Sequence, residues 1–198
     1  MNFPSTRDPL RPSPLDDGAI DALWMHAAGQ LGFTVTRTQA AYATSDGRGG
    51  IGVGTRQSLD VDDCVAQLVL HELCHALVEG EPGLALVDWG LDNTSDRDVD
   101  REYASLRLQA HFADAQGLRL QMAPTTEWRP YYDNLPENPL AGSDEAAHLA
   151  NQALRTALFR SWAPLISKAM EHTRLRLQAL GARVVVHSEF TIARSARA

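Results

Sequence analysis

The sequence predicts an α+β fold: helices around a small antiparallel or mixed sheet. Apolar residues recur at helical spacing along most of the chain, whereas strict alternation is confined to short segments. A length of 198 residues suits one domain with a real core and is short for two. We expect a single domain at 14–192, between a proline-rich flexible arm at 1–13 and a tail at 193–198.

The N-terminal part is predicted to hold one helix and then two strands. The helix begins at Pro14 and stops before Gly32, because proline favours the first helical position and glycine the end. Apolar and polar residues alternate at 33–36, which predicts a strand. A turn-rich run at 45–50 then leads into an extended segment at 51–57, so the pattern predicts a β-hairpin with a longer loop.

The next helix is predicted from residue 62 to residue 79, because aspartates start it and Gly80 ends it. At about 100° per residue, its apolar side chains form one buried stripe. His71 and His75 lie on the opposite side, stacked one turn apart. The stripe consists of Ala66, Val69, Leu70, Leu73 and Leu77.

His71, Glu72 and His75 form a His-Glu-x-x-His motif on this helix. Two imidazoles at i and i+4 converge on one metal ion, and the glutamate can reach a water on that ion without binding the metal. A bound zinc ion lowers the pKa of its water toward about 7, and the glutamate takes the proton. The alternative is a chance match, with both histidines satisfied by ordinary hydrogen bonds. The shared face of the two histidines favours metal binding.

Zinc sites of this kind need a third protein ligand and an open position. Glu102 is the predicted ligand, because it lies at the edge of the apolar stripe of a helix at 96–116, where a charge is costly unless paired or metal-bound. His111 lies on the opposite side of that helix. The alternative for Glu102 is a rim salt bridge with Arg101, Arg107 or a neighbouring element. The other acidic candidates are Asp88, Asp92, Asp96, Asp98 and Asp100. We interpret Asp98 as a helix cap, together with Ser95, rather than as a group that orients a ligand histidine.

The C-terminal half is predicted to contain a long loop at 124–142, helices at 143–162 and 165–180, and a final strand at 184–192. Aromatic residues of the loop, together with Trp89, either form a cleft wall, where a tyrosine can stabilise an oxyanion, or pin the loop to the core. Both alternatives stay open for Trp89, Trp128, Tyr131 and Tyr132.

The sequence His-Glu-Leu-Cys-His, followed by a helix with Glu102 in Arg-Glu-Tyr-Ala-Ser, resembles the small gluzincin-type metallopeptidases. The third ligand in that family is a glutamate on the next helix. The resemblance implies a zincin-like domain with zinc held by His71, His75 and Glu102, and with Glu72 as general base. The chain departs from the pattern at Ser105, where many relatives have an acidic or amide residue.

A second, local resemblance is to the elongation factor P hydroxylases. It rests on the same motif, on Gly80 and on the run Leu86-Val87-Asp88-Trp89-Gly90, and it covers some twenty residues. Those enzymes use iron to oxidise a modified lysine on a protein. Two histidines and a carboxylate are also the ligands of non-haem iron oxygenases. The resemblance implies Fe²⁺ in place of Zn²⁺, and oxidation in place of hydrolysis.

Bulk properties exclude several classes of partner. The net charge is −7, which is unlike the basic footprint of a nucleic-acid or membrane-surface protein. Residues 1–14 contain no apolar signal segment, so we expect a soluble cytoplasmic protein. Cys64 and Cys74 lie on one helix, about 15 Å apart along its axis, which is too far for a disulfide.

The leading functional prediction is a zinc-dependent hydrolase of metallopeptidase type, acting on a peptide or protein substrate. Its rivals are an iron-dependent hydroxylase and a non-catalytic zincin-fold binding module. The segment at 51–57 is the expected edge strand for an extended substrate, because Gly50, Gly52 and Gly54 leave one face nearly bare. The alternative is that these glycines allow tight packing against a neighbouring helix.

Overall fold

The computed structural model describes residues 15, 17–92 and 94–182, and their architecture is α+β with a small mixed sheet, as predicted. Short 3₁₀ turns η1, η2 and η3 span Asp88–Gly90, Asp96–Asp98 and Thr126–Trp128. The predicted arm, tail and final strand at 184–192 lie outside the described residues. The helices and strands are α1 (Gly18–Gln30), β1 (Thr34–Thr38), β2 (Ala43–Ser45), β3 (Gly50–Gly54), α2 (Val65–Leu84), α3 (Val99–Asp114), α4 (Arg129–Tyr132), α5 (Glu145–Phe159) and α6 (Trp162–Ala179).

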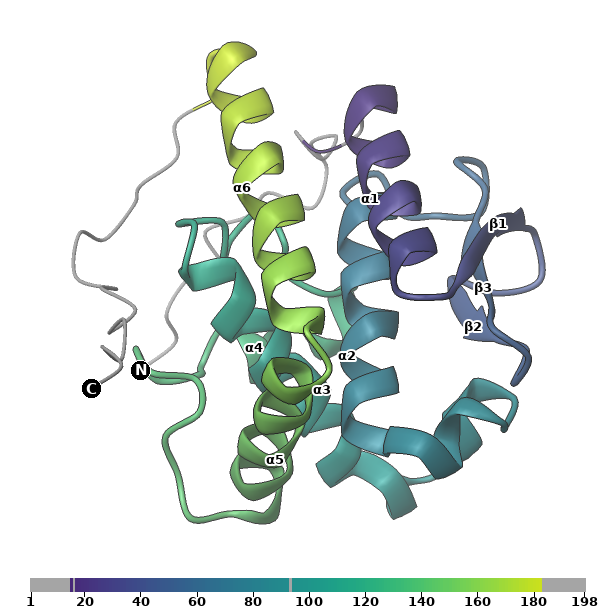
Figure 1. Cartoon of the computed structure of the whole chain (residues 1–198), viewed down its shortest axis with the longest axis vertical. Coiled ribbons are helices and arrows are strands. Elements are labelled where there is room, and N and C mark those ends of the chain that lie inside the picture. The colour runs from purple at the N-terminus through teal and green to yellow at the C-terminus, as the bar shows by residue number, and fades with distance from the viewer. Residues whose placement is uncertain (1–14, 16, 93, 183–198) are drawn as a thin grey trace.

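Helix α2 runs through the centre of the molecule (Figure 1), with the sheet on one side and α3 and α5 on the other. The predicted apolar stripe of α2 is fully buried: Leu70 and Leu73, for example, have no exposed surface. The opposite side, which carries His75, is also buried, because α3 packs against it. The helix therefore has two buried faces, and the motif lies inside the fold.

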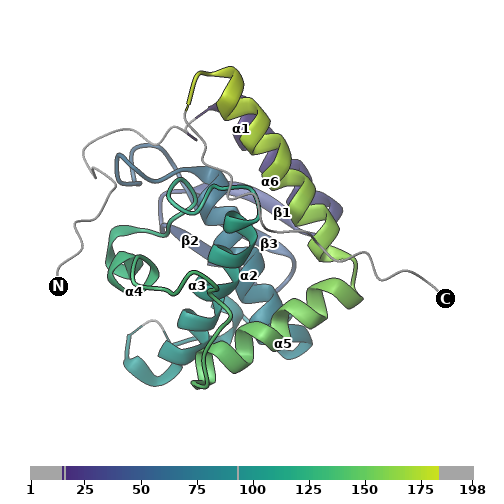
Figure 2. The same ribbon diagram turned by 90° about the vertical axis from the view of Figure 1, so that its left-hand side faces the viewer.

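Helices α1 and α6 lie side by side on the outside of this layer (Figures 1 and 2). The Trp24 side chain joins them, because its Nε1–H donates to Thr173 Oγ1 at 2.9 Å in a fully buried position. Buried tryptophan nitrogens need such a partner. The first and last helices of the described chain are thus held against each other.

Several helix ends differ from the predicted ones. Helix α1 begins at Gly18, because the side chain of Asp17 caps it, and the predicted start at Pro14 lies outside the described residues. The predicted end of the helix that carries His71 and His75 is confirmed, since Gly80 has a positive φ of 63° that interrupts regular helix within α2. The break between α5 and α6 falls at Ser161, with a φ of 61°, and Pro164 lies in the first turn of α6.

The predicted hairpin between residues 33–36 and 51–57 is wrong. The sheet order is β1-β3-β2, and β1 pairs with β3 in parallel, with Thr34 opposite Gly50. The hairpin joins β2 to β3 instead, through the turn in which Asp46 accepts hydrogen bonds from the backbone of Arg48 and Gly50. Since β3 is paired on both sides, the expected substrate strand at 51–57 is a central strand and offers no edge.

The glycines of β3 are explained by the close approach of neighbouring side chains. A Cβ on Gly52 would lie 2.8 Å from the Thr44 Cγ2 methyl and 3.3 Å from that of Thr38. On Gly54 it would lie 2.6 Å from Leu59 Cδ2. The glycines therefore allow tight packing, but against strand and loop side chains and not against a neighbouring helix as the alternative expected.

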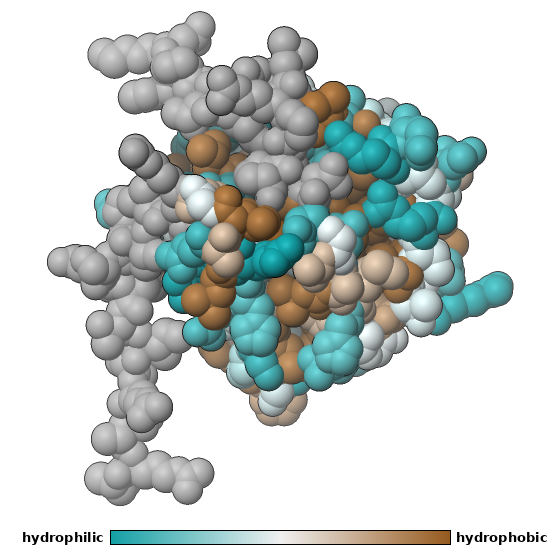
Figure 3. Space-filling view, turned by 90° about the horizontal axis from the view of Figure 1, so that it is seen from above, coloured by the Kyte–Doolittle hydropathy of each residue, from teal (hydrophilic) through white to brown (hydrophobic). Residues whose placement is uncertain are grey.

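None of the helices in the described part of the chain is long and apolar enough to cross a bilayer. Hydrophobic and hydrophilic residues are interspersed over the face seen in Figure 3, as is ordinary for folded proteins. Cys64 and Cys74 are both buried thiols that are not joined in a disulfide, and the Cys64 sulfur accepts the N–H of Gln67 at the start of α2.

Two glycine substitutions should have opposite effects on stability. Gly52→Ala forces a methyl against Thr44 and Thr38, and overpacking of this kind costs about 1–3 kcal/mol. Gly29→Ala, in α1 with open space around the new methyl, should stabilise by about 0.4–1 kcal/mol. Chemical denaturation of the two variants measures both changes. A Gly52→Ala protein as stable as wild type would contradict the packing explanation.

Candidate metal centre

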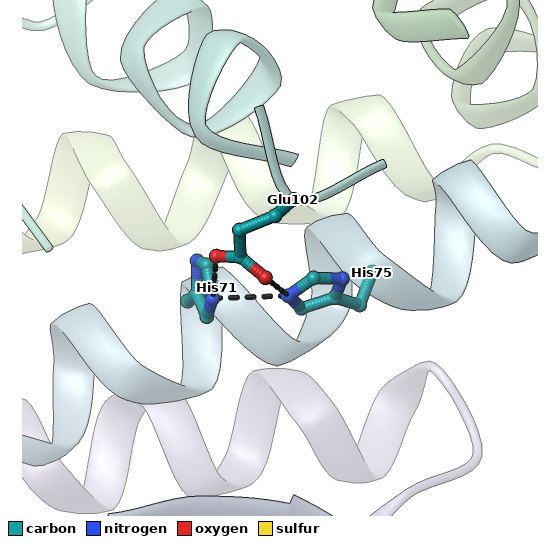
Figure 4. A group of neighbouring side chains, drawn as sticks. All are labelled: His71, His75 and Glu102. Carbon is teal, nitrogen blue, oxygen red and sulfur yellow. Dashed lines mark hydrogen bonds and ion pairs between the residues drawn. The ribbon is translucent and has the colours of Figure 1, made fainter. Parts of the chain in front are cut away.

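The α2–α3 contact brings the three predicted ligands together. Glu102, from the first turns of α3, places its carboxylate between the two imidazoles on α2 (Figure 4). Its Oε1 lies 3.1 Å from His71 Nε2, and its Oε2 lies 3.1 Å from His75 Nε2. The two Nε2 atoms are 3.0 Å apart. All three ligand atoms lie within 4.8 Å of one another, so the group can hold one metal ion.

Each ligand histidine has a polar partner behind it, also on α3. His71 Nδ1 lies 2.9 Å from the side-chain oxygen of Gln109, and the amide nitrogen of Gln109 donates to the Met122 carbonyl at 2.6 Å. His75 Nδ1 lies 3.0 Å from Ser105 Oγ. Such partners fix the ring orientation of metal-binding histidines. Both rings therefore direct Nε2 at Glu102.

The Glu102 carboxylate and the two imidazoles stabilise each other's charged forms. Burial by itself would lower the pKa of His71, but the adjacent Glu102 carboxylate, together with Glu72 and the hydrogen bond to Gln109, outweighs it and raises that pKa to about 9. Burial raises the pKa of Glu102, yet the two imidazoles outweigh it and hold that pKa well below its usual range. A carboxylate that stays ionised at this depth needs a cation, whether a proton on the histidines or a metal ion.

One carboxylate oxygen of Glu102 lacks a well-oriented hydrogen bond in the described part of the chain, which indicates that the residues fit a metal. Glu102 Oε1 is buried and makes no well-oriented hydrogen bond within the described residues, although it lies close to His71 Nε2. Imidazole nitrogens and a carboxylate oxygen are the donors used by catalytic zinc and by non-haem iron sites. The three residues thus fit one divalent ion, and their donor set does not distinguish Zn²⁺ from Fe²⁺.

Glu72 lies beside the ligands and is not one of them. Its Oε2 accepts a hydrogen bond of 2.7 Å from Trp89 Nε1, and its side chain is buried. Burial raises the pKa of Glu72, against the opposing effect of the two imidazoles. A buried carboxyl group with a raised pKa, next to a candidate metal centre, is suited to proton transfer.

The candidate centre forms the floor of a cavity of about 440 Å³. Its walls come from β2, from the 3₁₀ turn η1 and from the segment around η3. A smaller cavity of about 220 Å³ adjoins it and shares Glu102 and Trp128. The wall residues include Tyr42, Ala43, Thr44, Asp60, Asp88, Trp89, Leu91, Thr125, Thr126, Glu127 and Trp128.

Turn η1 is bound to the sheet by Asp88. Its Oδ1 accepts the Thr44 hydroxyl at 2.5 Å and the Ser45 N–H at 3.3 Å, and Ser45 Oγ accepts the Trp89 N–H at 3.1 Å. Both Asp88 and Trp89 have positive φ values, of 47° and 59°. This network holds the Trp89 indole against Glu72. Asp88 acts as an anchor here, and its carboxylate is absent from the His71–His75–Glu102 group.

The structure decides between several sequence alternatives. The alternative of a rim salt bridge between Glu102 and Arg101 or Arg107 is not observed: Arg101 pairs with Glu79, and Arg107 pairs with Asp144 at 2.9 Å. Asp98 neither orients a histidine nor caps α3 with its side chain, because it accepts the Asp92 N–H and pairs with Arg97. Ser95 caps η2 instead, and the remaining acidic candidates, together with His111, lie outside the group.

The aromatic residues divide between the two roles. Trp89 and Trp128 line the cavity. Tyr131 stacks on Tyr103 with ring centroids 3.7 Å apart, and Tyr132 is buried, so these two pin the segment after η3 to α3. Part of the predicted long loop at 124–142 is therefore helical, as η3 and α4.

Sequence reasoning missed Gln109, and it noted Ser105 only as a departure from the gluzincin pattern. Ser105 follows Glu102 by three residues and Gln109 follows it by seven, which places all three on one face of a helix. This spacing was the signal in the sequence that could have identified them. Comparison of the chain with protein-family models, curated proteins and solved structures found no match. Both family resemblances consequently rest on the motif residues alone.

Replacing any one ligand should lower metal content and stability together. His71→Ala, His75→Ala and Glu102→Ala each remove one donor, and a ligand that binds only the native state stabilises it by mass action. Metal analysis and thermal unfolding of each variant measure the two effects. His148→Ala, an exposed histidine on α5, is the control and should keep its metal. Full metal content in Glu102→Ala would remove that residue from the centre.

The pH dependence of stability should differ between metal-free and metal-loaded protein. In chelator, the raised pKa of His71 contributes stability below about pH 6.5 that is lost as the pH rises to about 9. Metal binding requires a neutral imidazole, so it tightens over the same range. The gap in melting temperature between loaded and chelated protein should therefore widen from pH 6.5 to 9. A gap that stays constant would contradict a centre containing His71.

Proposed function

We propose that the protein is a metal-dependent hydrolase of metallopeptidase type with a zincin-like pairing of α2 and α3. The observation that carries the proposal is the position of Glu72: a buried carboxylate in the cavity, beside three convergent ligands and not among them. A metal that only held two helices together would have no use for this group. The size of the cavity, at about 440 Å³, suits a side chain or short segment of a peptide.

The roles of the residues follow from their contacts. His71, His75 and Glu102 would hold the ion, which when bound supplies a Lewis acid that polarises a carbonyl and lowers the pKa of its water toward about 7. Trp89 holds Oε2 of Glu72, so Oε1 is the oxygen that accepts the proton of the attacking water. Glu72 then returns this proton to the leaving amine nitrogen. Trp89 and Trp128 reduce the access of bulk water to the cavity floor.

A second candidate is an iron-dependent hydroxylase that acts on a protein side chain. The observation in its favour is that Asp88 and Trp89, from the run that resembles elongation factor P hydroxylases, both line the same cavity. The ligand set also suits non-haem iron. In this reaction the cavity would take a side chain, and Glu72 would position it.

Replacing the proposed base should separate binding from turnover. Glu72→Gln keeps the shape of the side chain and its hydrogen bond to Trp89, but the amide cannot accept a proton. We expect unchanged metal content and a turnover lower by about 10²–10⁴-fold, the contribution of a general base. Glu81→Gln, an exposed glutamate on the same helix, is the control.

The assay uses protein purified without added metal, a mixed peptide library and mass spectrometry. About one equivalent of zinc with cleaved peptides is the expected result. Iron, oxygen consumption and a product heavier by one oxygen atom would replace this proposal by the hydroxylase. Cleavage at the wild-type rate by Glu72→Gln would remove Glu72 from the mechanism.

A further inference from the structure

We infer that Gln109 is a positioning residue of the metal centre: its neutral side-chain amide fixes His71 with the Nε2 lone pair facing Glu102. The inference rests on the metal centre proposed above, and it does not depend on which reaction that centre performs. Gln109 has no exposed surface, and both ends of its amide are engaged.

The orientation of the amide follows from its partner on the other side. The Met122 carbonyl can only accept a hydrogen bond, so the NH₂ group of Gln109 must face it, at 2.6 Å. The amide oxygen then faces His71 Nδ1 at 2.9 Å. That oxygen can only accept, so Nδ1 must carry the hydrogen.

This hydrogen decides what His71 presents to the metal. A neutral imidazole has one N–H, so the lone pair of His71 lies on Nε2, the atom 3.1 Å from Glu102 Oε1. The hydroxyl of Ser105 cannot impose the same choice on His75, because it can donate or accept. Gln109 therefore fixes the tautomer of its histidine, whereas Ser105 does not.

Gln109 also links the ligands into one unit. Glu102 and Gln109 lie seven residues apart on the same face of α3, so a shift of this helix moves the third ligand and the partner of the first together. A carboxylate at position 109 would strengthen the hydrogen bond to His71. It would also add a third negative charge to a site that already contains Glu72 and Glu102, and the amide avoids that cost.

The experiment compares Gln109→Leu with Gln109→Glu. Zinc affinity is measured by competition with a chelator, and the stability of each chelated protein by thermal unfolding. Gln109→Leu has no acceptor for Nδ1–H and should bind zinc about 10- to 100-fold more weakly, the usual loss when the partner of a ligand histidine is removed. Gln109→Glu keeps the acceptor. It should bind zinc at least as tightly as wild type, although its metal-free form melts at a lower temperature.

The matched control is Gln67→Leu, which also removes a buried amide, one that donates to Asp63 at 2.6 Å at the start of α2. It should be destabilised with little change in zinc affinity. Equal zinc affinities for the two leucine variants would overturn the inference, because the loss would then reflect packing alone. If Gln109→Glu does not fold, this comparison decides by itself. A wild-type protein that binds no zinc or iron would instead overturn the metal centre itself.

Discussion

The Glu102 carboxylate, buried between two imidazoles, is the interaction on which the arrangement of the molecule depends. A charge at this depth is tolerated only if its partners stay in place, so the spacing of α2 and α3 has to be fixed. The core supplies that rigidity, since every residue of α3 from Ala104 to Ala110 is buried. Arg107 adds to it by donating to the Pro139 and Ala141 carbonyls, which ties the segment before α5 to α3.

Helices were predictable from the sequence to the extent that one face of each repeats locally. The stop at Gly80 and the buried stripe of α2 follow from this periodicity, and both are present. The sheet was not predictable, because its order depends on β2, a strand of only three residues. Without β2, the two longer strands look like a hairpin. With it, β3 is free to pair in parallel with β1, and the glycines of β3 admit Thr44 and Thr38.

The candidate site was likewise most predictable where its residues lie close together in the sequence. His71, Glu72 and His75 are a local motif, so the sequence suffices to single them out. Glu102 was inferred from a boundary position on its helix, although α3 is buried around most of its circumference, so the boundary is weaker than the pattern suggested. Gln109 depends on the rotation of α3 relative to α2 and on the path of the chain at Met122. The seven-residue spacing places Gln109 on the same face as Glu102, but neither the rotation nor the path of the chain can be read from one helix.

The contrast between the floor and the walls of the cavity bears on function. The ligands, Glu72 and the partners of the histidines all come from α2 and α3, which are held in the core. The walls come from β2, η1 and η3, which are short segments at the surface. In the proposed hydrolase, chemistry that needs exact distances would thereby lie on rigid elements, and substrate selection on segments that can vary. The exception is Trp89, which belongs to a wall yet bonds Glu72. Through this contact, a shift of η1 would also alter the orientation of Glu72, so in the proposed hydrolase substrate recognition and proton transfer would share one hydrogen bond.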